Sequence, residues 1–337
     1  MIRDAIEAIV DGRNLSKHDA SSAMDEIMTG NATPAQFGSF VTALRLKGET
    51  PDEIAGMALV MREKSLHVDI DARAVDTCGT GGDGSGTFNI STTAGFVLAG
   101  TGIIVAKHGN RAMSGTCGSA DVLEALGVKI TLGPNGVKRC LEEVGFGFMF
   151  AQTFHPSMKY AAGPRREIGI RTVFNMLGPL TNPANVDSQL IGVADPNLAE
   201  KIIEVLAILG SRHALVVHGA GGLDEISLEG PTKIWELKNR QISLHEITPE
   251  DIGLDSVSTK RLKVTSVEES VETVRKVLSG QRGAARDVVL ANAAGALLAA
   301  DKVTTVAEGV GVAARSIDSG SALEKLDVLV ELTQKLE

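Results

Sequence analysis

Glycine, threonine and aspartate are concentrated in the segment Asp76–Thr87, which reads DTCGTGGDGSGT. A strand-like run, Ala74–Cys78, leads into this segment, and Asn89–Thr92 opens a predicted helix after it. Glycines let backbone N–H groups approach an anion closely, and a helix N-terminus adds unpaired donors and a partial positive charge. The arrangement predicts a cradle for phosphate or pyrophosphate, although it matches neither the dinucleotide fingerprint nor the P-loop. The alternative is a flexible glycine loop without a ligand.

Three carboxylates accompany this predicted cradle. Asp83 lies within it, where a carboxylate would repel phosphate unless it faces ribose hydroxyls, a metal or backbone donors. A turn aspartate bonded to its own backbone is the alternative for Asp83. Asp224 and Glu225 follow a predicted strand, Ala214–His218, and adjacent carboxylates on a loop suit Mg²⁺, which shares its shell with substrate phosphates and waters. Without the cradle, they would be an ordinary surface acidic pair.

A basic segment, Lys107–Arg111 (KHGNR), follows the strand-like run Ile103–Ala106. Open α/β sheets bind ligands at the carboxyl ends of their strands, so Lys107 could supply a charge for phosphate. Small polar residues at 113–119 then precede a predicted helix, Ala120–Leu126, and form a second candidate phosphate turn. A solvated basic turn is the alternative, with His108 as a structural or positioning histidine and Cys117 as a buried small residue.

Three arginines, Arg165, Arg166 and Arg171, follow a Gly-Pro pair and could hold a carboxylate in a bidentate fork. The alternative is that they are solvated surface side chains.

Helix-start signals mark the first ~65 residues, which predict a small helical module. Ser16 precedes Asp19 in a loose capping box, and Thr33-Pro34 and Thr50-Pro51 place proline at the first helical position. Such a module could serve as a lid, as a dimerisation surface, or as both.

Alternating strands and helices begin at Ala74 and predict a largely parallel sheet with helical crossovers. We expect helices at Ala199–Leu209 and Val288–Ala300, and surface hairpins and loops over 220–262. Residues His155–Ala162 and Arg166–Met176 are also predicted as helices, the second ended by Gly178-Pro179, and they could pack back onto the first module. The expected domains are therefore 1–70, joined by residues of about 163–183, and 71–337.

Composition excludes several classes of protein. The 337 residues are 43% hydrophobic and 3% aromatic with 37 glycines, which suits a globular α/β protein better than a disordered chain or an all-β sandwich. Lys+Arg 33 against Asp+Glu 42 gives a net charge of −9, which argues against a nucleic-acid or membrane-surface binder. Three scattered cysteines are too few for a disulfide framework or a zinc site and indicate a reducing cytoplasm. Residues 1–10 do not look like a signal peptide, and the uncharged run 84–106 is a poor membrane span.

Taken together, these segments resemble the anthranilate phosphoribosyltransferase family of tryptophan biosynthesis over nearly the whole chain. The resemblance rests on a set of motifs whose joint order and spacing are specific: DTCGTGGDG at 76–84, NIST at 89–92, KHGNR at 107–111, GSADVLEALG at 118–127, His155-Pro156, Arg165–Arg166, GIRTVFNMLGP at 169–179 and LDE at 223–225. It implies a small helical domain and a large α/β domain in the nucleoside phosphorylase-like phosphoribosyltransferase fold, and a homodimer formed through the helical domain.

The resemblance also implies roles for individual residues. Those that would bind phosphoribosyl pyrophosphate (PRPP) are Gly79, Gly82, Asp83, Thr87, Asn89, Ile90, Ser91, Thr92, Lys107, His108, Gly109, Asn110, Arg111, Ala112, Met113, Ser114, Gly115 and Ser119. Those that would contact anthranilate are Gly79, Asn110 and Arg165. Two Mg²⁺ ions would be held, one by Ser91 and Glu225 and one by Asp224 and Glu225. At Thr116 the chain departs from the lysine that is common in the family.

The implied reaction moves the 5-phosphoribosyl group from PRPP to the amine of anthranilate, giving N-(5-phosphoribosyl)anthranilate and pyrophosphate. A neutral aromatic amine requires no strong base before it attacks, so positioning and charge stabilisation would supply catalysis and no catalytic base is assigned. Two alternatives remain: a phosphoribosyltransferase of the same fold with another acceptor, and a pyrimidine nucleoside phosphorylase, which would use phosphate without Mg²⁺. A non-catalytic relative that binds nucleic acid is disfavoured by the charge.

Overall fold

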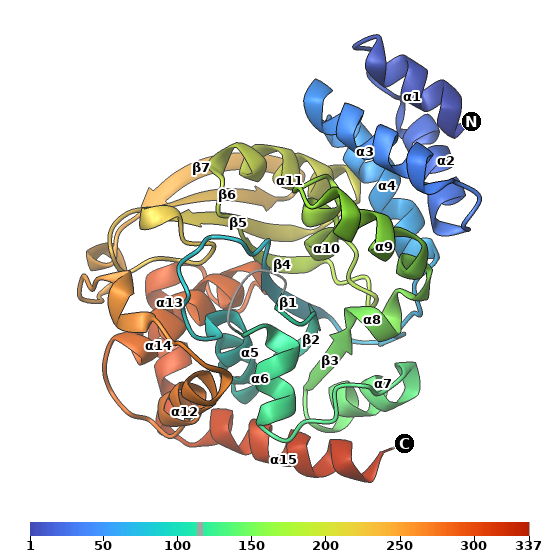
Figure 1. The fold of residues 1–337 in the computed structure, drawn as a ribbon. Helices are drawn as coiled ribbons and strands as arrows, with labels where there is room; N and C mark the ends of the chain where they lie inside the picture. The colour runs from blue at the N-terminus through green and yellow to red at the C-terminus, as the bar shows by residue number, and fades with distance from the viewer. Residues whose placement is uncertain (113–116, 337) are drawn as a thin grey trace.

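The computed structural model describes residues 1–112 and 117–336, which form a helical domain and an α/β domain (Figure 1). The strands are β1 Ala74–Gly79, β2 Ile104–Gly109, β3 Phe146–Phe150, β4 Ser188–Gly192, β5 His213–Gly219, β6 Thr232–Lys238 and β7 Gln241–Ile247. The α-helices are α1 Ile2–Val10, α2 Lys17–Met28, α3 Pro34–Lys47, α4 Pro51–Glu63, α5 Ile90–Gly100, α6 Ser119–Ala125, α7 Pro134–Glu143, α8 Ala151–Phe154, α9 Lys159–Ile168, α10 Phe174–Leu180, α11 Pro196–Ile208, α12 Val267–Leu278, α13 Ala284–Ala299, α14 Val306–Asp318 and α15 Ser321–Lys335.

Helices α2, α3 and α4 begin where the sequence signals placed them. The Ser16 side chain accepts a hydrogen bond from the backbone N–H of Asp19, and Thr33 and Thr50 each form a complete capping box. These caps satisfy N–H groups that a helix cannot pair internally. The expected helical module is therefore confirmed, with Phe37 and Phe40 in its core.

The seven strands form one sheet in the order β3-β2-β1-β4-β5-β6-β7. The first five are parallel, and β6 and β7 extend the sheet in antiparallel fashion. Because the chain runs outward from β1 to β3 and then returns to the other side of β1 at β4, the strand order reverses between β1 and β4. Ligands of open α/β sheets bind at such a reversal, beyond the carboxyl ends of the strands.

The two faces of the sheet belong to different hydrophobic clusters. Leu190 and Leu215 point to the face covered by α5 and α13, whereas their neighbours Ile191 and Val216 point to the face covered by α11. This is the period-two alternation of a strand buried on both sides. Helix α4 packs on α11, so the helical domain lies on the second face (Figure 1).

The chain returns to the helical domain after β3. Helix α9 packs on α2 and α3, α10 packs on α4, and the rings of Phe37 and Phe174 lie 5.4 Å apart. The prediction of one helix over Arg166–Met176 was wrong, because α9 ends at Ile168. Gly169 then adopts a left-handed φ of 68°, which terminates a helix.

Three further boundaries differ from expectation. Residues 156–158 form a 3-10 turn, so the helix predicted at His155–Ala162 begins only at Lys159. Strand β2 runs on through Gly109 and pairs with β3, so Lys107 and His108 belong to a strand and not to the turn after it. Within 220–262, the expected hairpin is present, but Ile234 and Leu237 of β6 are fully buried in the sheet.

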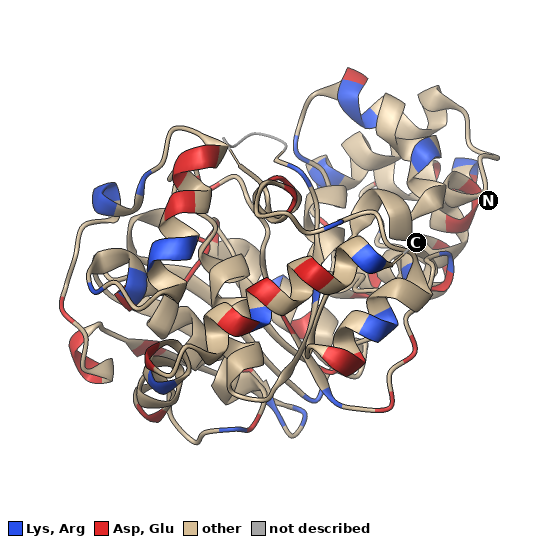
Figure 2. Cartoon of the chain, turned by 90° about the horizontal axis from the view of Figure 1, so that it is seen from below, with Lys and Arg blue, Asp and Glu red and all other residues tan. Residues whose placement is uncertain are grey.

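Acidic and basic residues are interspersed along the outer helices (Figure 2). Lys276 pairs with Glu272 and Arg139 with Glu143, each one helical turn apart. In the described part of the chain, every helix is too short or too polar to cross a membrane.

Candidate functional site

The loop that follows β5 lies directly against the carboxyl ends of β1 and β4. A Cβ added to Gly79 would lie 2.3 Å from the Asp224 Oδ2, and one added to Gly192 would lie 1.6 Å from the Asp224 carbonyl oxygen. Such distances exclude any side chain, so glycine is required at both strand ends. The candidate site is therefore at the reversal of strand order, with Asp224 at its centre.

The glycine-rich segment leaves β1 and is held by this aspartate. The backbone N–H of Gly81 donates to the Asp224 Oδ2 at 2.8 Å. Asp83 accepts from the backbone N–H of Ser85 at 3.0 Å, as the turn alternative predicts, and its carboxyl also interacts with that of Asp224. The buried hydroxyls of Thr77 and Thr80 have no hydrogen-bond partner among the described residues. Unpaired buried hydroxyls beside a glycine loop are what a polar ligand would satisfy.

The N-terminus of α5 meets the acidic pair and the buried lysine. The backbone N–H of Ser91 donates to Glu225 Oε1 at 3.1 Å, so a carboxylate already lies at the positive end of the helix. Lys107 is 1% exposed, and its Nζ donates to the Thr77 carbonyl at 2.5 Å and lies 3.4 Å from the Ser91 hydroxyl. The structure thus brings together Ser91, Lys107 and Glu225 from three distant parts of the sequence.

The other predicted residues of this helix start have different environments. Asn89 donates from Nδ2 to the carbonyl of Cys117 at 3.1 Å, which ties the start of α5 to the segment before α6. Ile90 and Thr92 are at most 1% exposed, so neither side chain is open to solvent. Thr87 forms an isolated bridge with Lys263, which orders the turn before the helix.

Burial and mutual repulsion raise the pKa values of the acidic pair. Burial, followed by the charge of Asp83, raises the pKa of Asp224 to about 7. Burial, followed by the charge of Asp224, raises the pKa of Glu225 well above its ordinary value. Carboxylates crowded in this way are stabilised by a cation between them.

The oxygen atoms of the site fit a Mg²⁺ ion whose coordination shell is completed by a bound ligand. Among residues 1–112 and 117–336, no group of three or more His, Cys, Asp or Glu side chains is arranged to hold a metal. Mg²⁺ typically uses only one or two carboxylates, together with waters and substrate phosphates. Asp224, Glu225 and the Ser91 hydroxyl could provide that partial shell.

The second predicted phosphate turn is anchored on α6. Ser119 donates from its hydroxyl to the Asn110 carbonyl at 3.3 Å, and a Cβ on Gly109 would lie 2.2 Å from the Ser119 Oγ. These contacts hold the end of β2 against the start of α6. The predicted residues Met113, Ser114 and Gly115, and Thr116 with them, lie outside the described residues.

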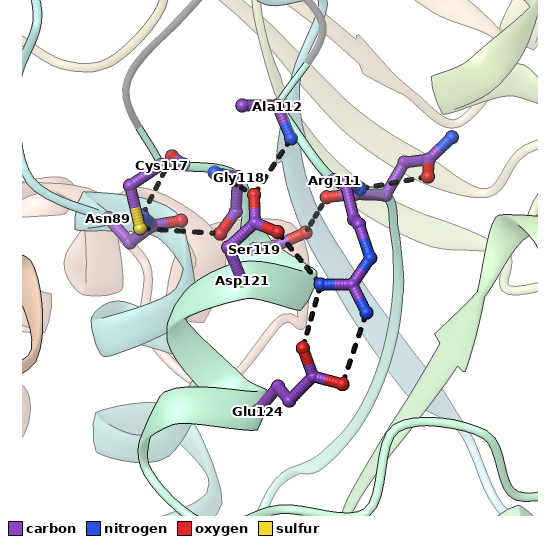
Figure 3. A network of polar contacts seen from close by, with 9 residues as sticks. Asn89, Arg111, Ala112, Cys117, Gly118, Ser119, Asp121 and Glu124 are labelled. Atoms are coloured by element: carbon purple, nitrogen blue, oxygen red, sulfur yellow. Dashed lines mark hydrogen bonds and ion pairs between the residues drawn. The ribbon is translucent and has the colours of Figure 1, made fainter. Parts of the chain in front are cut away.

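Arg111 points toward α6, where two carboxylates pair with it (Figure 3). Its guanidinium donates to Asp121 at 3.0 Å and to both carboxylate oxygens of Glu124 at 2.8 and 3.1 Å. Asp121 also accepts from the backbone N–H groups of Ala112 and Gly118, each at 2.9 Å. The charge of Arg111 is therefore already paired, a contact that the sequence alone did not reveal.

Two neutral histidines lie on the opposite side of β2. The rings of His108 and His155 lie 5.0 Å apart, and burial lowers their pKa values to about 3 and about 4. His108 Nδ1 lies 3.2 Å from the Gly178 carbonyl, which assigns its proton to Nδ1. The Nε2 atoms of both rings are buried without a partner among the described residues. No site role was predicted for His155 from the sequence, although it lies only one short helix, α8, after the buried strand β3.

The three predicted arginines have separate environments. Arg165 lies half-buried with its guanidinium 5.1 Å from the centre of the Phe174 ring, and burial lowers its pKa. No carboxylate of the described residues forms an ion pair with Arg165, which leaves its fork free for an anion. Arg166 is exposed, and Arg171 donates to the carbonyls of Gly81 and Gly82 instead of to a carboxylate.

Comparison with known proteins places these features in a family. A family model described as "Glycosyl transferase family, a/b domain" matches residues 71–323, and one for the helical bundle domain matches residues 3–65. The anthranilate phosphoribosyltransferases of Dehalococcoides mccartyi and Chloroflexus aurantiacus are each 56% identical to the chain, over 100% and 99% of it respectively and over 99% of each relative. The crystal structure of the Thermus thermophilus enzyme of that name superposes with a TM-score of 0.94 at 41% identity, covering 98% of this chain and 99% of that one. The Saccharomyces cerevisiae enzyme in complex with PRPP and Mg gives 0.92 at 28% identity, covering 99% and 98%.

The raised pKa of Asp224 predicts a specific dependence of stability on pH. Between about pH 4 and pH 7, the folded chain holds a proton that the unfolded chain has released. The stability contributed by this carboxyl is therefore present in full at low pH and is lost as the pH rises through 7. In metal-free buffer, Asp224→Asn should raise the melting temperature at pH 8, by an amount worth roughly 1–2 kcal/mol.

Thermal unfolding in EDTA at pH 5 and pH 8 measures this effect. The gain from Asp224→Asn should be clearly smaller at pH 5, because the folded carboxyl is then neutral and only the ionisation of the unfolded chain still disfavours the wild type. Asp69→Asn changes an exposed carboxylate and is the matched control. The same melting-temperature difference at both pH values would show that Asp224 is ionised throughout.

Proposed function

The chain belongs to the anthranilate phosphoribosyltransferase family, and we propose how its residues carry out the reaction of that family. The enzyme transfers the 5-phosphoribosyl group from PRPP to the amine of anthranilate and releases pyrophosphate, a step of tryptophan biosynthesis. One observation supports the roles proposed for individual residues. The glycine segment, the α5 N-terminus and the Asp224–Glu225 pair contact one another beyond the ends of β1 and β4.

PRPP would bind along this edge of the sheet. Backbone N–H groups of the glycine segment and of α5, together with Lys107, would face its phosphates, and Asp83 would face its ribose hydroxyls. Ser119 and Asn110 would continue the site toward α6, since they already contact each other there. The pairing of Arg111 with Glu124 supports a role for Arg111 in anchoring the end of β2 on α6, rather than in binding PRPP.

Magnesium would be held by the acidic pair, and we infer two ions, one with Ser91 and Glu225 and one with Asp224 and Glu225. The yeast relative was solved with PRPP and Mg, which supports the use of this metal. Bound magnesium would supply a compensating charge for the departing pyrophosphate. The raised pKa values of both carboxyls support this assignment, because a cation would relieve their repulsion.

Anthranilate would bind between Arg165, Asn110 and Gly79. The anthranilate carboxylate would pair with the half-buried guanidinium of Arg165, which forms no ion pair with a carboxylate of the described residues. The ring of Phe174 holds that guanidinium in place. The ribose carbon would pass through an oxocarbenium-like state, and the amine attacks without a base. The Saccharomyces cerevisiae enzyme has also been solved in complex with 4-fluoroanthranilate, which supports an aromatic acceptor.

We also infer that residues 1–70, with about 163–183, act as one domain and 71–337 as the other. The three cysteines are free, which supports a reducing compartment, the cytoplasm.

Loss of anthranilate fluorescence on mixing the protein with PRPP and Mg²⁺ tests the reaction and its metal together. EDTA should abolish the loss. The double variant Asp224→Asn/Glu225→Gln should lower the rate at limiting Mg²⁺ by about 100-fold or more, because the developing charge loses its counter-ion. Asp69→Asn is the control. Full activity of the double variant would exclude this pair as the metal site, and no turnover by the wild type would exclude the acceptor.

Arg165→Ala tests the acceptor site. It should raise the KM for anthranilate by about tenfold or more, the size of a lost charge-assisted hydrogen bond, and change the KM for PRPP by less than about twofold. Steady-state kinetics with each substrate varied in turn measures both values. The neighbouring, exposed Arg166→Ala should leave both unchanged. A larger effect on PRPP than on anthranilate would place Arg165 at the donor instead.

We propose that the helical domain forms a homodimer. Large apolar side chains are exposed on it: Val10 is 69% exposed, Leu46 83% and Leu59 42%. Exposed apolar area of this kind favours association. Leu46→Glu should shift the protein toward monomer in sedimentation velocity, whereas Val328→Glu, at a 41% exposed position of α15, should not. A wild-type monomer at micromolar concentration would contradict the proposal.

A further inference from the structure

The segment between α9 and α10 connects the helical domain to the glycine-rich segment of the α/β domain. Arg171 of this connection donates from Nη2 to the Gly81 carbonyl at 3.2 Å and from Nη1 to the Gly82 carbonyl at 3.5 Å. A guanidinium that holds two successive carbonyls fixes the orientation of two successive peptide planes.

Gly82 is shaped to this contact. Its φ is +76°, and a Cβ there would lie 1.9 Å from the Arg171 Nη1. A side chain at this position would displace the arginine even if the backbone could tolerate it. Glycine is thus favoured at 82 by the positive φ, and the absence of a side chain there lets Arg171 approach this closely.

The peptide geometry then determines what the segment offers to a ligand. In a trans peptide, the C=O of one residue and the N–H of the next point in opposite directions. Because Arg171 draws the carbonyls of Gly81 and Gly82 toward itself, the N–H groups of Gly82 and Asp83 point away from it. Within the described residues, neither of these N–H groups donates to a protein atom. Arg171 therefore turns two free donors outward and covers the two acceptors that would repel an anion.

Arg171 is itself held by the helical domain. Arg45, in the last turn of α3, donates from Nη1 to the Arg171 backbone carbonyl. The side chains of both arginines are exposed, so neither is fixed by burial. One continuous set of contacts runs from α3 through Arg171 to the glycine segment, and Asp224 holds the other side of Gly81.

We propose that Arg171 is a positioning residue for the phosphoribosyl donor, and that Arg45 aims it from the helical domain. This inference rests on the proposed binding of PRPP at the glycine segment. Arg171 prepares the N–H groups of Gly82 and Asp83 for phosphate or ribose oxygens, and Arg45 acts only through Arg171. The helical domain then contributes to donor affinity without touching the donor.

A double-mutant cycle on PRPP tests the dependence of one arginine on the other. Arg171→Ala should weaken PRPP binding, measured by calorimetry with Mg²⁺, by about tenfold, and Arg45→Ala by about threefold. The double variant should bind like Arg171→Ala alone, because Arg45 has nothing left to aim. The KM for anthranilate and kcat at saturating PRPP should change by less than about twofold. Arg13→Ala, an exposed arginine of the same domain paired only with Asp11, is the control.

Two further measurements separate positioning from direct contact with the donor. In the ligand-free protein, the amides of Thr80 and Gly81 donate to the Gly192 carbonyl and to Asp224, and their hydrogen exchange should rise in both Arg171→Ala and Arg45→Ala. Arg171→Lys should recover only part of the affinity, since an ammonium cannot hold two carbonyls in one plane. Additive losses in the cycle, or weakened binding with unchanged exchange, would overturn the inference. If the wild-type protein itself bound no PRPP, the proposed function would fail instead, which the calorimetry of the wild type reports separately.

Discussion

The close approach of the Asp224 loop to the ends of β1 and β4 is the constraint on which the rest of the site depends. The loop lies so near that Gly79 and Gly192 admit no side chain. That proximity lets one carboxylate hold the Gly81 N–H, face Asp83 and sit beside Glu225, which in turn caps α5 at Ser91. Gly79 and Gly192 are thus explained by contacts within the chain and not by the approach of an anion. Shifting this loop would disturb the glycine segment, the helix start and the acidic pair together.

Charged and neutral side chains lie on different faces of the sheet at this edge, because successive side chains of β2 point to opposite faces. Lys107 and His108 are neighbours in one strand, so they point to opposite faces. The lysine lies on the side of Ser91 and Glu225, whereas the neutral His108 lies beside His155 and the Gly178 carbonyl. A charged environment for phosphates and an uncharged one on the other face are therefore separated by a single peptide unit. Asp76, fully buried, accepts from the backbone N–H of His108 and from Asn182 and keeps that peptide unit in place.

Local signals in the sequence predicted the helix starts and the glycine segment, because caps and strand–glycine–helix patterns are encoded within a few residues. Local signals could not predict contacts between residues that are far apart in the sequence. Asp224 is 143 residues from Gly81, and Arg171 is 90 residues from it, so neither pairing has a local signature. The break at Gly169 was missed because apolar residues continue on both sides of it at helical spacing. The extension of β2 through Lys107 was also missed. A charged side chain is buried in a strand only where polar partners such as Ser91 surround it, and the sequence does not reveal those partners.

The return of α9 and α10 to the helical domain has a consequence for how the chain is made. Helices α2 and α3 pack on α9, and α4 packs on α10 and α11, all of which follow β3 in the chain. During synthesis, the early helices leave the ribosome with an exposed apolar face, because Phe37 can pack on Phe174 only after α10 has been made. Strands β1, β2 and β3 are made in that interval. The N-terminal helices therefore expose apolar surface during synthesis for longer than a contiguous bundle of the same size would.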